Sequence, residues 1–558
     1  MKLRRSTMLV GVVCLPQLAV AGGLMLPGAG AISTSRAGAA VASADDGEAV
    51  VLNPAGIVKA QGTTITVSAA MIQYAMEFQR RGSYDAVPGE NYPYAGQAFA
   101  LVKNDASPPF GIGSIQPLPV IAILSDLGGA IPRFHAGLGL YAPNSYPFRD
   151  LCTQTASGCQ KYVFQIAGNG DFTAPPPGTR YDIMKQEAAI LLPSLVLGYR
   201  VLPTLDVGLR LSAGTANLKS TTSLWSTLGP NYEEDPKKDG AITIDAKDGF
   251  VPGFGIGATF RPTPNIELGL NYASELDIHA KGTAVSQLGP SAGVPGLDVQ
   301  IMPVSDDAAR CAPGGTQAEL KACVDLALAM NVQIGGRYLF LDDAGKPRGD
   351  IELDLDWEHW GKSCSDDDLF DGQCTSPSDY RVVVDATTVI VPPVGPPIPG
   401  LPLHDSAVRH GLRDTFGVRL GGSYRLPVGA MRDDGESNQL IVRGGLGYET
   451  AAAKTGWLRA DLDGAARTTV TVGAAYRARR FEVSVGGGAV LESPSNPNVG
   501  GGAAPCNPTM TAPGCGGDEH QGPDPINPTA AAQAESPVNQ GDYKAHYLLF
   551  MLGVSTWF

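Results

Sequence analysis

The chain has little of what a helical membrane protein, an enzyme or a nucleic-acid-binding protein needs. Beyond residue 21 it has no run of about 18 apolar residues, so no segment can cross a membrane as a helix. It has only seven histidines, and neither a G-x-S-x-G motif nor a metal-type histidine cluster. The 41 basic residues are outnumbered by 55 acidic ones, which argues against nucleic acid as a partner. We therefore expect no enzyme activity, no metal and no cofactor.

The first 21 residues have the features of an export signal. Residues 2–5 carry three basic side chains, an apolar stretch covers 8–18, and Ala-Val-Ala at 19–21 is an A-x-A cleavage site. Cys14 could anchor a lipid, but Val13 is too bulky for the small residue expected before a lipidated cysteine. The sequence predicts a removable signal peptide over 1–21.

Eight cysteines remain after the signal, in four close pairs, and none of the spacings is C-x-x-C. An exported chain meets an oxidising compartment, which favours disulfides over metal or redox chemistry. Local pairing is the simplest connectivity. The predicted bridges are Cys152–Cys159, Cys311–Cys323, Cys364–Cys374 and Cys506–Cys515.

Period-2 alternation of apolar and polar residues recurs along the chain and predicts an all-β protein. The fourteen candidate strands are 62–80, 112–127, 132–143, 182–201, 204–222, 248–261, 265–283, 323–341, 348–360, 409–426, 438–450, 466–478, 480–492 and 543–558. Connections after odd-numbered strands are mostly long and those after even-numbered strands are short. Every cysteine pair lies in, or at the edge of, a long connection. An even number of strands with one-sided long loops predicts a transmembrane antiparallel β-barrel, whereas a soluble sandwich would not place the pairs on one side.

The alternation also predicts which side chains face lipid and which face the lumen. In 414–424, Phe416, Val418 and Leu420 share one face, and Thr415 and Arg419 share the other. The same division recurs in 205–212 and 266–272. The first set suits lipid.

Several expected lumenal positions are charged. One strand presents the acidic row Glu352, Asp354, Asp356 and Glu358, and other strands present Arg210, Arg337, Arg419 and Arg443. These arginines are candidate contacts for a ligand carboxylate, because guanidinium groups bind carboxylates through charge-assisted hydrogen bonds. The alternative is that they neutralise the acidic row and brace the barrel interior. The sequence does not select a ligand-binding arginine.

One long connection holds an apolar, proline-rich stretch at 389–403. An exposed apolar surface of this size usually contacts something, and proline holds such a segment extended. It could capture a ligand, cover neighbouring loops or contact the membrane. The candidate capture residues are Val389, Ile390, Val391, Ile398, Leu401 and Leu403.

A small-residue stretch at 38–56, which ends in Asn53-Pro54-Ala55-Gly56, resembles the hatch of FadL-type outer-membrane channels. Similar segments follow in the family's order, among them 134–143, 192–201, 254–262 and 268–272, 356–360, 414–417 and 472–477. The chain ends on Trp557-Phe558, and a terminal aromatic resembles the assembly signal of outer-membrane barrels. The chain is identified as a member of the FadL/TodX (OmpP1) family.

The resemblance implies a hatch over 22–61 that plugs a barrel formed by 62–558, located in the bacterial outer membrane and surrounded by lipid and lipopolysaccharide. It also implies passive uptake of hydrophobic molecules, most often long-chain fatty acids, through extracellular loops, a lumenal pocket and a side opening near a kinked third strand. Aromatic or aliphatic hydrocarbons are the alternative cargo. Relatives suggest a monomer that the barrel-assembly machinery recognises by its last strand.

Two small motifs are candidate gating elements. Asn53, Pro54, Ala55 and Gly56 would turn the hatch toward the first strand, with proline fixing φ and glycine permitting a left-handed bend, and Asn53 could hydrogen-bond the wall beside the kink. In the third strand, Gly137 and Gly139 are candidates for that kink, because strand glycines often mark a bulge. The alternatives are a purely structural turn and a strand packed closely against the hatch.

Two other functions share parts of this pattern. A nonspecific porin has the same barrel and polar lumen, but a plugged pore does not suit bulk diffusion. A surface adhesin or structural barrel would use the large disulfide-clipped loops. Loss of cell binding with intact uptake after loop deletion would favour the adhesin.

Overall fold

The structure is a computed structural model. It describes residues 25–60, 62–80, 82–86, 92–163, 172, 174–224, 236–237, 239–287, 298–403, 406–429, 437–454, 458–462, 464–493 and 541–558. The predicted signal peptide, including Cys14, and the predicted Cys506–Cys515 bridge lie outside these residues. No helix in the described part is long and apolar enough to span a membrane.

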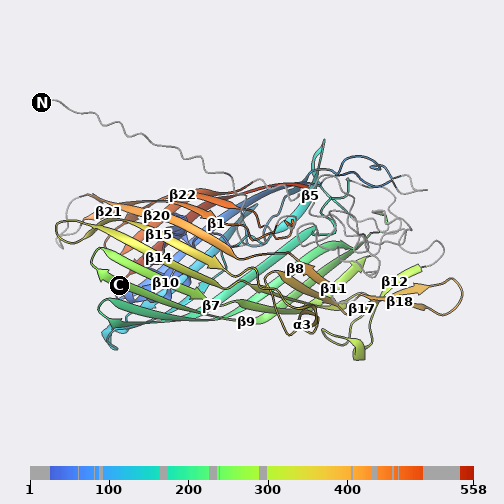
Figure 1. The fold of residues 1–558 in the computed structure, drawn as a ribbon, viewed down its shortest axis with the longest axis horizontal. Coiled ribbons are helices and arrows are strands. Elements are labelled where there is room, and N and C mark those ends of the chain that lie inside the picture. Colours follow the sequence, from blue (N-terminus) through green and yellow to red (C-terminus); the bar gives the residue numbers. More distant parts are fainter. Residues whose placement is uncertain are drawn as a thin grey trace.

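The described strands form a closed antiparallel barrel, seen from the side in Figure 1. Fourteen wall strands follow one another around it, and β1 and β24 close the ring over a ladder from Thr64↔Trp557 to Arg80↔Gly541. The wall is built by β1 (Thr63–Arg80), β3 (Ile115–Ser125), β4 (Phe134–Tyr141), β7 (Lys185–Leu202), β8 (Leu205–Leu224), β9 (Gly240–Thr263), β10 (Ile266–Ala273) with β11 (Leu276–Gln287), β13 (Leu320–Leu328) with β14 (Asn331–Leu341), β15 (Pro347–Glu358), β20 (Thr415–Val428), β21 (Asn438–Glu449), β22 (Arg467–Arg477), β23 (Phe481–Glu492) and β24 (Gly541–Trp557). The predicted all-β barrel is confirmed.

Four predicted strands differ clearly from the observed ones, and the one expected at 248–261 begins eight residues earlier, at Gly240. The strand expected at 265–283 is split between Ala273 and Leu276, and the one at 323–341 is split between Leu328 and Asn331. The strand expected from 409 begins at Thr415, because Ser406–Arg409 (β19) pairs instead with the loop strand β16 (Asp379–Val384). Alternation alone cannot show that such a segment pairs beyond the ring and not within it.

Burial alternates along the wall strands as the sequence predicts. Phe416 and Val418 are exposed on the outside of β20, whereas Arg419 between Val418 and Leu420 is buried. In β10, Leu268 and Leu270 face outward. An outward apolar face on every side suits hydrocarbon, because a barrel satisfies its backbone hydrogen bonds internally.

The long connections gather at one end of the barrel and the short turns at the other. At the long-connection end, additional strands extend the wall: β2 (Val102–Asn104), β5 (Arg149–Thr155), β6 (Gly158–Lys161), β16 and β19. A separate sheet of β12 (Asp298–Pro303), β17 (Ala386–Val391) and β18 (Ile398–Leu403) projects beyond that end (Figure 1). The same region holds the short helix α3 (Asp366–Phe370) and the 3-10 helix η3 (Asp306–Ala308), while η2 (Leu127–Gly129) lies in a short turn.

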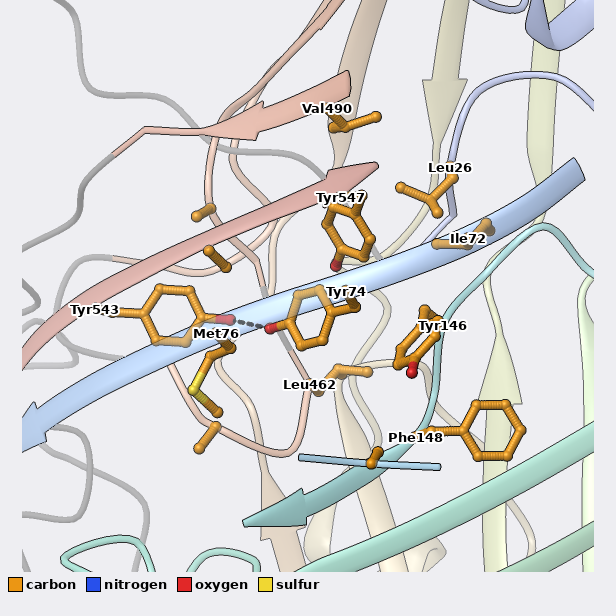
Figure 2. Close-up of a cluster of buried hydrophobic side chains, with 14 of the residues drawn as sticks. Leu26, Ile72, Tyr74, Met76, Tyr146, Phe148, Leu462, Val490, Tyr543 and Tyr547 are labelled. Atoms are coloured by element: carbon orange, nitrogen blue, oxygen red, sulfur yellow. Dashed lines mark hydrogen bonds between the residues drawn. The ribbon is translucent and has the colours of Figure 1, made fainter. Parts of the chain in front are cut away.

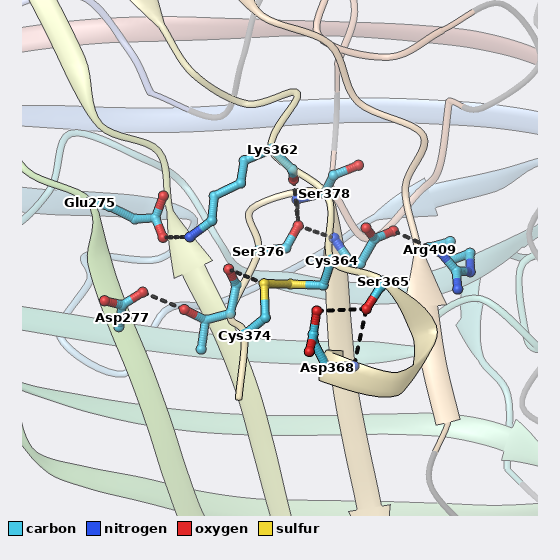
Figure 3. Close-up of a disulfide and its surroundings, with 12 residues drawn as sticks. Glu275, Asp277, Lys362, Cys364, Ser365, Asp368, Cys374, Ser376, Ser378 and Arg409 are labelled. Atoms are coloured by element: carbon cyan, nitrogen blue, oxygen red, sulfur yellow. Dashed lines mark hydrogen bonds and ion pairs between the residues drawn. A yellow bond between two sulfur atoms is a disulfide. The ribbon is translucent and has the colours of Figure 1, made fainter. Parts of the chain in front are cut away.

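Three disulfides join the cysteines that are near in sequence: Cys152–Cys159, Cys311–Cys323 and Cys364–Cys374. Figure 3 shows the third, which closes a loop beside α3. The same loop is tied to the wall by an ion pair between Lys362 and Glu275 and by a hydrogen bond from Thr375 to Asp277. Closing a loop of this size stabilises it by about 3 kcal/mol through the entropy of the unfolded chain.

Residues 25–60, called here the N-terminal segment, lie inside the barrel. The segment contains α1 (Ala31–Thr34), α2 (Ala49–Leu52) and the 3-10 helix η1 (Pro54–Lys59), and nearly all of its side chains are buried. Small residues let it approach the wall closely: a Cβ on Gly445 of β21 would lie 2.1 Å from the Arg36 carbonyl carbon. Helices this short are held by their surroundings and not by their own propensity.

Candidate transport path

The acidic row of β15 hydrogen-bonds the N-terminal segment. Asp354 Oδ2 accepts the backbone N–H groups of Ala40 (2.8 Å) and Val41 (3.0 Å), and Glu352 Oε1 accepts that of Ala42 (2.6 Å). Arg36 of the segment forms ion pairs of 2.8 Å with Asp350 and Glu352. Carboxylates that bind backbone N–H groups and a guanidinium fix the position of this turn in the lumen.

A buried carboxylate inside the segment holds α1. Glu48 accepts hydrogen bonds from the N–H groups of Ile32 (2.9 Å) and Ser33 (2.8 Å) and from the hydroxyl of Ser68 on β1 (3.1 Å). The N-terminal N–H groups of a helix have no partner within it, so an acid at this position satisfies them. Glu48 thereby joins the two halves of the segment to the barrel wall.

Asn53 links the segment to β9. Its side-chain NH₂ donates to the carbonyls of Val41 (2.7 Å) and Ala258 (3.1 Å), and its Oδ1 accepts the N–H of Ala55 (3.1 Å). These bonds lie at β9 and not beside β4, so the predicted position of Asn53 next to a third-strand kink is wrong. The side chain still connects segment to wall.

Gly56 of the same motif must be a small residue for a reason other than the predicted left-handed bend. Gly56 does not adopt a left-handed conformation, whereas Gly62, just before β1, has φ 66°. At Gly56 a Cβ would lie 2.4 Å from the carbonyl oxygen of Ala44. Close packing, with Pro54 and Ala55 against Gly208 of β8, therefore requires the small residue.

Replacing Asn53 with alanine is expected to loosen η1 and α2. The change leaves buried carbonyls and the Ala55 N–H without this partner, and such losses cost about 1–3 kcal/mol. Hydrogen exchange of the amides of 49–59 should accelerate, while exchange in β20 to β22 stays unchanged. Unaltered exchange in 49–59 would show that Asn53 does not hold the segment.

Three of the four candidate arginines contact carboxylates of the barrel wall, and the fourth, Arg210, contacts the N-terminal segment. Arg337 pairs with Glu267 (2.7 Å) and Asp350 (2.9 Å), Arg419 with Glu449 (2.7 Å) and Asp356 (3.1 Å), and Arg443 with Glu482 (2.5 Å). Arg210 Nη1 donates to the carbonyls of Val50 and Val51, both at 2.9 Å. Arg210 and Arg419 also line a small cavity of about 100 Å³ beside the N-terminal segment. These contacts brace the barrel interior, which is the alternative to ligand binding that the sequence leaves open.

The barrel wall is interrupted where β4 ends. Within the described strand pairings, β3 is bonded to β4 only from Val120 to Ser125, and β7 is bonded to β4 only from Leu192 to Tyr199. The facing edges, 115–119 of β3 and 187–191 of β7, have no ladder to each other. Proline is tolerated on an unpaired edge, and this stretch of β3 contains Pro117 and Pro119.

After Tyr141 the chain leaves the wall and turns inward. The Asn144 side chain donates to the carbonyls of Leu26 (3.1 Å), Pro27 (3.0 Å) and Gly28 (2.8 Å), which ties this turn to the N-terminal segment. β4 pairs in unbroken register through Gly137 and Gly139, and its ladder ends two residues later, at Tyr141, so the kink expected at these glycines stays a prediction. Gly139 packs against the segment, since a Cβ there would lie 2.6 Å from Val50 Cγ1.

An aromatic cluster anchors the inward chain (Figure 2). Tyr74 and Tyr543 share a hydrogen bond of 2.6 Å between their hydroxyls, and the Tyr146 ring lies 5.5 Å from that of Tyr74. The Arg149 guanidinium stacks over Tyr74 at 4.4 Å, and its Nε donates to the Ala460 carbonyl at 2.9 Å. The inward turn is thereby packed between β1, β24 and the connection that follows β21.

A cavity of about 640 Å³ extends from the lumen to the interrupted wall. Its lining is mostly apolar and comes from β3 and β4, from the start of β7, from the end of β8, from β13 and from the loop strand β16, with further residues from the connections. Representative lining residues are Leu118, Pro119, Leu140, Ala188, Ala189, Ile190, Leu191, Leu326, Leu328 and Val382. Cavities of 300–1,000 Å³ with apolar walls are typical of sites for small molecules.

One side of this cavity is charged. Arg459 contacts Asp182 through Nη2 and Asp461 through Nε (3.1 Å), and His410 Nε2 lies 2.9 Å from Asp461 Oδ2. Burial raises the pKa of Asp182 to about 6. Burial acts in the same direction on Asp461, but Arg459 and His410 outweigh it and hold the pKa of Asp461 well below its usual range.

The sequence did not point to this cluster. Arg459 and Asp461 lie in the connection between β21 and β22, and Asp182 lies before β7, so no strand alternation marks them. The contacts that unite them join residues 278 positions apart, as in the hydrogen bond from the Ala460 N–H to Asp182 (2.8 Å). Their spacing along the chain gives no sign of it.

The predicted capture residues lie on the projecting sheet. Val389, Ile390 and Val391 belong to β17, which pairs with β12 and with β18, where Ile398 lies. Ile398 is exposed, and none of these four lines the cavity. The side chains of Leu401 and Leu403 lie outside what the structure describes.

No group of three or more histidine, cysteine or acidic residues among the described ones could hold a metal ion.

The barrel, the N-terminal segment and the cavity define a class of protein: an outer-membrane β-barrel with a polar interior, a segment within the lumen and an apolar cavity that reaches the wall.

Comparison with known proteins gives the family. The model of the outer membrane protein transport protein family (OMPP1/FadL/TodX) matches residues 12–360, and the chain belongs to this family. Its members are outer-membrane transporters of hydrophobic compounds and not enzymes.

Solved structures share the fold. A FadL homologue of Pseudomonas aeruginosa aligns with TM-score 0.61 and 13% identity over 96% of this chain and all of its own. The toluene transporter TbuX of Ralstonia pickettii aligns with TM-score 0.53 and 13% identity over 96% of this chain and 99% of its own. TodX, the toluene transporter of P. putida, gives 0.51, also at 13% identity, over 96% and 99%. No curated protein matches the chain.

Proposed function

We propose that this protein admits small hydrophobic molecules passively, through the apolar cavity and out sideways between β3 and β7 into the outer membrane. The observation that supports this path is the cavity lining, which runs from lumenal residues such as Leu326 to Pro119 and Ala189 at the interrupted wall. An apolar molecule on this path stays out of water from entry to exit, so it gains the free energy of burial throughout.

The N-terminal segment is proposed to act as the hatch. Its backbone is bound by Glu352 and Asp354, and Glu48 and Asn53 fix its two ends, so the route straight down the lumen is filled by hydrogen-bonded polar groups. A hydrophobic solute has no favourable contact there, because burying those groups without their partners is costly. The side opening therefore presents the lower free-energy barrier to a hydrophobic solute.

The long connections are proposed to face the cell exterior, with the apolar sheet of β17 and β18 collecting cargo. Recognition of β24 by the barrel-assembly machinery, contact with lipopolysaccharide and a monomeric state remain predictions from the sequence.

Two cargo classes each have one supporting observation. Arg459 on the cavity wall is a cation that could attract the carboxylate of a long-chain fatty acid. The contacts of Arg459 with Asp182 and Asp461 instead favour an uncharged hydrocarbon.

Uptake of labelled toluene and labelled oleate by cells that lack their own such channel tests the proposal. Cells that express this protein, with assembly in the outer membrane verified, should take up at least one cargo saturably. Absence of uptake of both by an assembled barrel would contradict the channel and favour the adhesin or structural role.

A further inference from the structure

The cations that line the cavity already face carboxylates. Among the described lining residues the cations are Arg459 and Lys219. Arg459 contacts both Asp182 and Asp461, and its remaining Nη1 donates to the carbonyl of Arg409 (3.2 Å). Lys219 Nζ lies 3.8 Å from Asp245.

The charged residues of the cavity lining therefore carry a net negative charge. Asp182, Asp461 and Glu187 face the cavity against Arg459 and Lys219, and Glu187 has Lys185 at 3.0 Å as a partner outside the lining. His410 contacts Asp461 from behind the cavity wall, and the Tyr380 ring packs on His410 with centroids 4.4 Å apart. The Arg459 guanidinium is thus held by two carboxylates and the Arg409 carbonyl.

This arrangement penalises an anionic ligand. A carboxylate that approached Arg459 would meet Asp182 and Asp461 at similar range, and like charges repel strongly where water is scarce. Displacing either acid from Arg459 would leave a buried charge unpaired, which is destabilising. An uncharged apolar ligand is not repelled by these acids and does not displace them from Arg459.

We propose that Asp182 and Asp461 are specificity determinants: by occupying Arg459 they exclude molecules that carry a carboxylate and leave the cavity to uncharged hydrophobic cargo. The inference rests on the proposed function, because it requires the cavity to hold cargo.

The test compares two ligands of equal chain length, dodecan-1-ol and dodecanoate, both radiolabelled. Equilibrium dialysis at pH 8 uses the purified full chain in detergent, with protein-free micelles as the blank. The wild-type protein should bind dodecan-1-ol at least about tenfold more tightly than dodecanoate. This arm needs no variant, so misfolding cannot obscure it.

The second part of the test removes the two carboxylates that pair with Arg459. Asp182→Asn with Asp461→Asn should tighten dodecanoate binding about tenfold and change dodecan-1-ol binding by less than about threefold. Asp325→Asn is the matched control, because Asp325 also lies between an arginine and a histidine, 2.8 Å from Arg381 and 2.8 Å from His279, but does not line the cavity. This control should leave the ratio of the two affinities unchanged.

The outcomes separate the two hypotheses. Equal binding of both ligands by the wild type, or a double variant whose ratio stays the same, would overturn the charge-based exclusion and leave the channel standing. Binding of neither ligand would overturn the proposed function and the exclusion with it.

Discussion

Replacing Ala189 with tryptophan is expected to reduce hydrophobic uptake at least about tenfold, which corresponds to about 1.4 kcal/mol or more in the barrier. Ala189 lines the cavity on the unpaired edge of β7, opposite the edge of β3 that contains Pro119. An indole side chain there fills the opening through which cargo is proposed to leave. The measurement is the initial rate of labelled cargo uptake per assembled barrel.

The control is Ala213→Trp on the neighbouring strand β8. Ala213 is exposed on the outside of the barrel and does not line the cavity, so a tryptophan there faces lipid without closing the path. Uptake by this variant should equal that of the wild type. If Ala189→Trp transports as well as Ala213→Trp, cargo does not pass between β3 and β7.

Removing the two carboxylates that bind the N-terminal segment is expected to release its central turn. In the variant with Glu352→Gln and Asp354→Asn, Arg36 loses one of its two ion-pair partners and the N–H groups of 40–43 lose their charged acceptors. Breaking a buried ion pair costs about 3–5 kcal/mol. Amide exchange in 36–43 should accelerate, and liposomes that contain the variant should swell faster in arabinose as the lumen opens to hydrophilic solutes.

Glu449→Gln provides the comparison for this result. Glu449 is a buried lumenal acid that pairs with Arg419 at 2.7 Å and has no contact of this kind with the N-terminal segment. It should lower barrel stability without raising arabinose permeation. Equal permeation in both variants would show that loss of barrel stability, and not release of the segment, opens the lumen.

The same experiment distinguishes this protein from a nonspecific porin. A porin would let arabinose through without any substitution, because its lumen is open. The wild-type chain is expected to block arabinose while admitting hydrophobic cargo, since the two routes differ in polarity and in position.

Much of the wall could be predicted from alternation, because a strand between lipid and lumen exposes successive side chains to two different media. This rule predicts directly that Phe416, Leu268 and Leu270 face outward and that Arg419 faces the lumen. The rule fails where the chain leaves the ring of wall strands. It placed a strand start at residue 409, where the chain belongs to β19, which extends the sheet beyond the ring of fourteen strands, and it gave no warning of the inward turn after Tyr141.

The sequence by itself determined the family, the even-numbered barrel and the three cysteine pairings that the structure describes, because each depends on local pattern or short spacing. The tertiary structure decided the exit and its chemistry. The opening exists because Asn144 binds carbonyls more than a hundred positions away, and Arg459 meets Asp182 across the lumen only once the barrel has closed. Contacts between residues so distant in sequence leave no periodic signal, so only folding brings the cavity and its charges together.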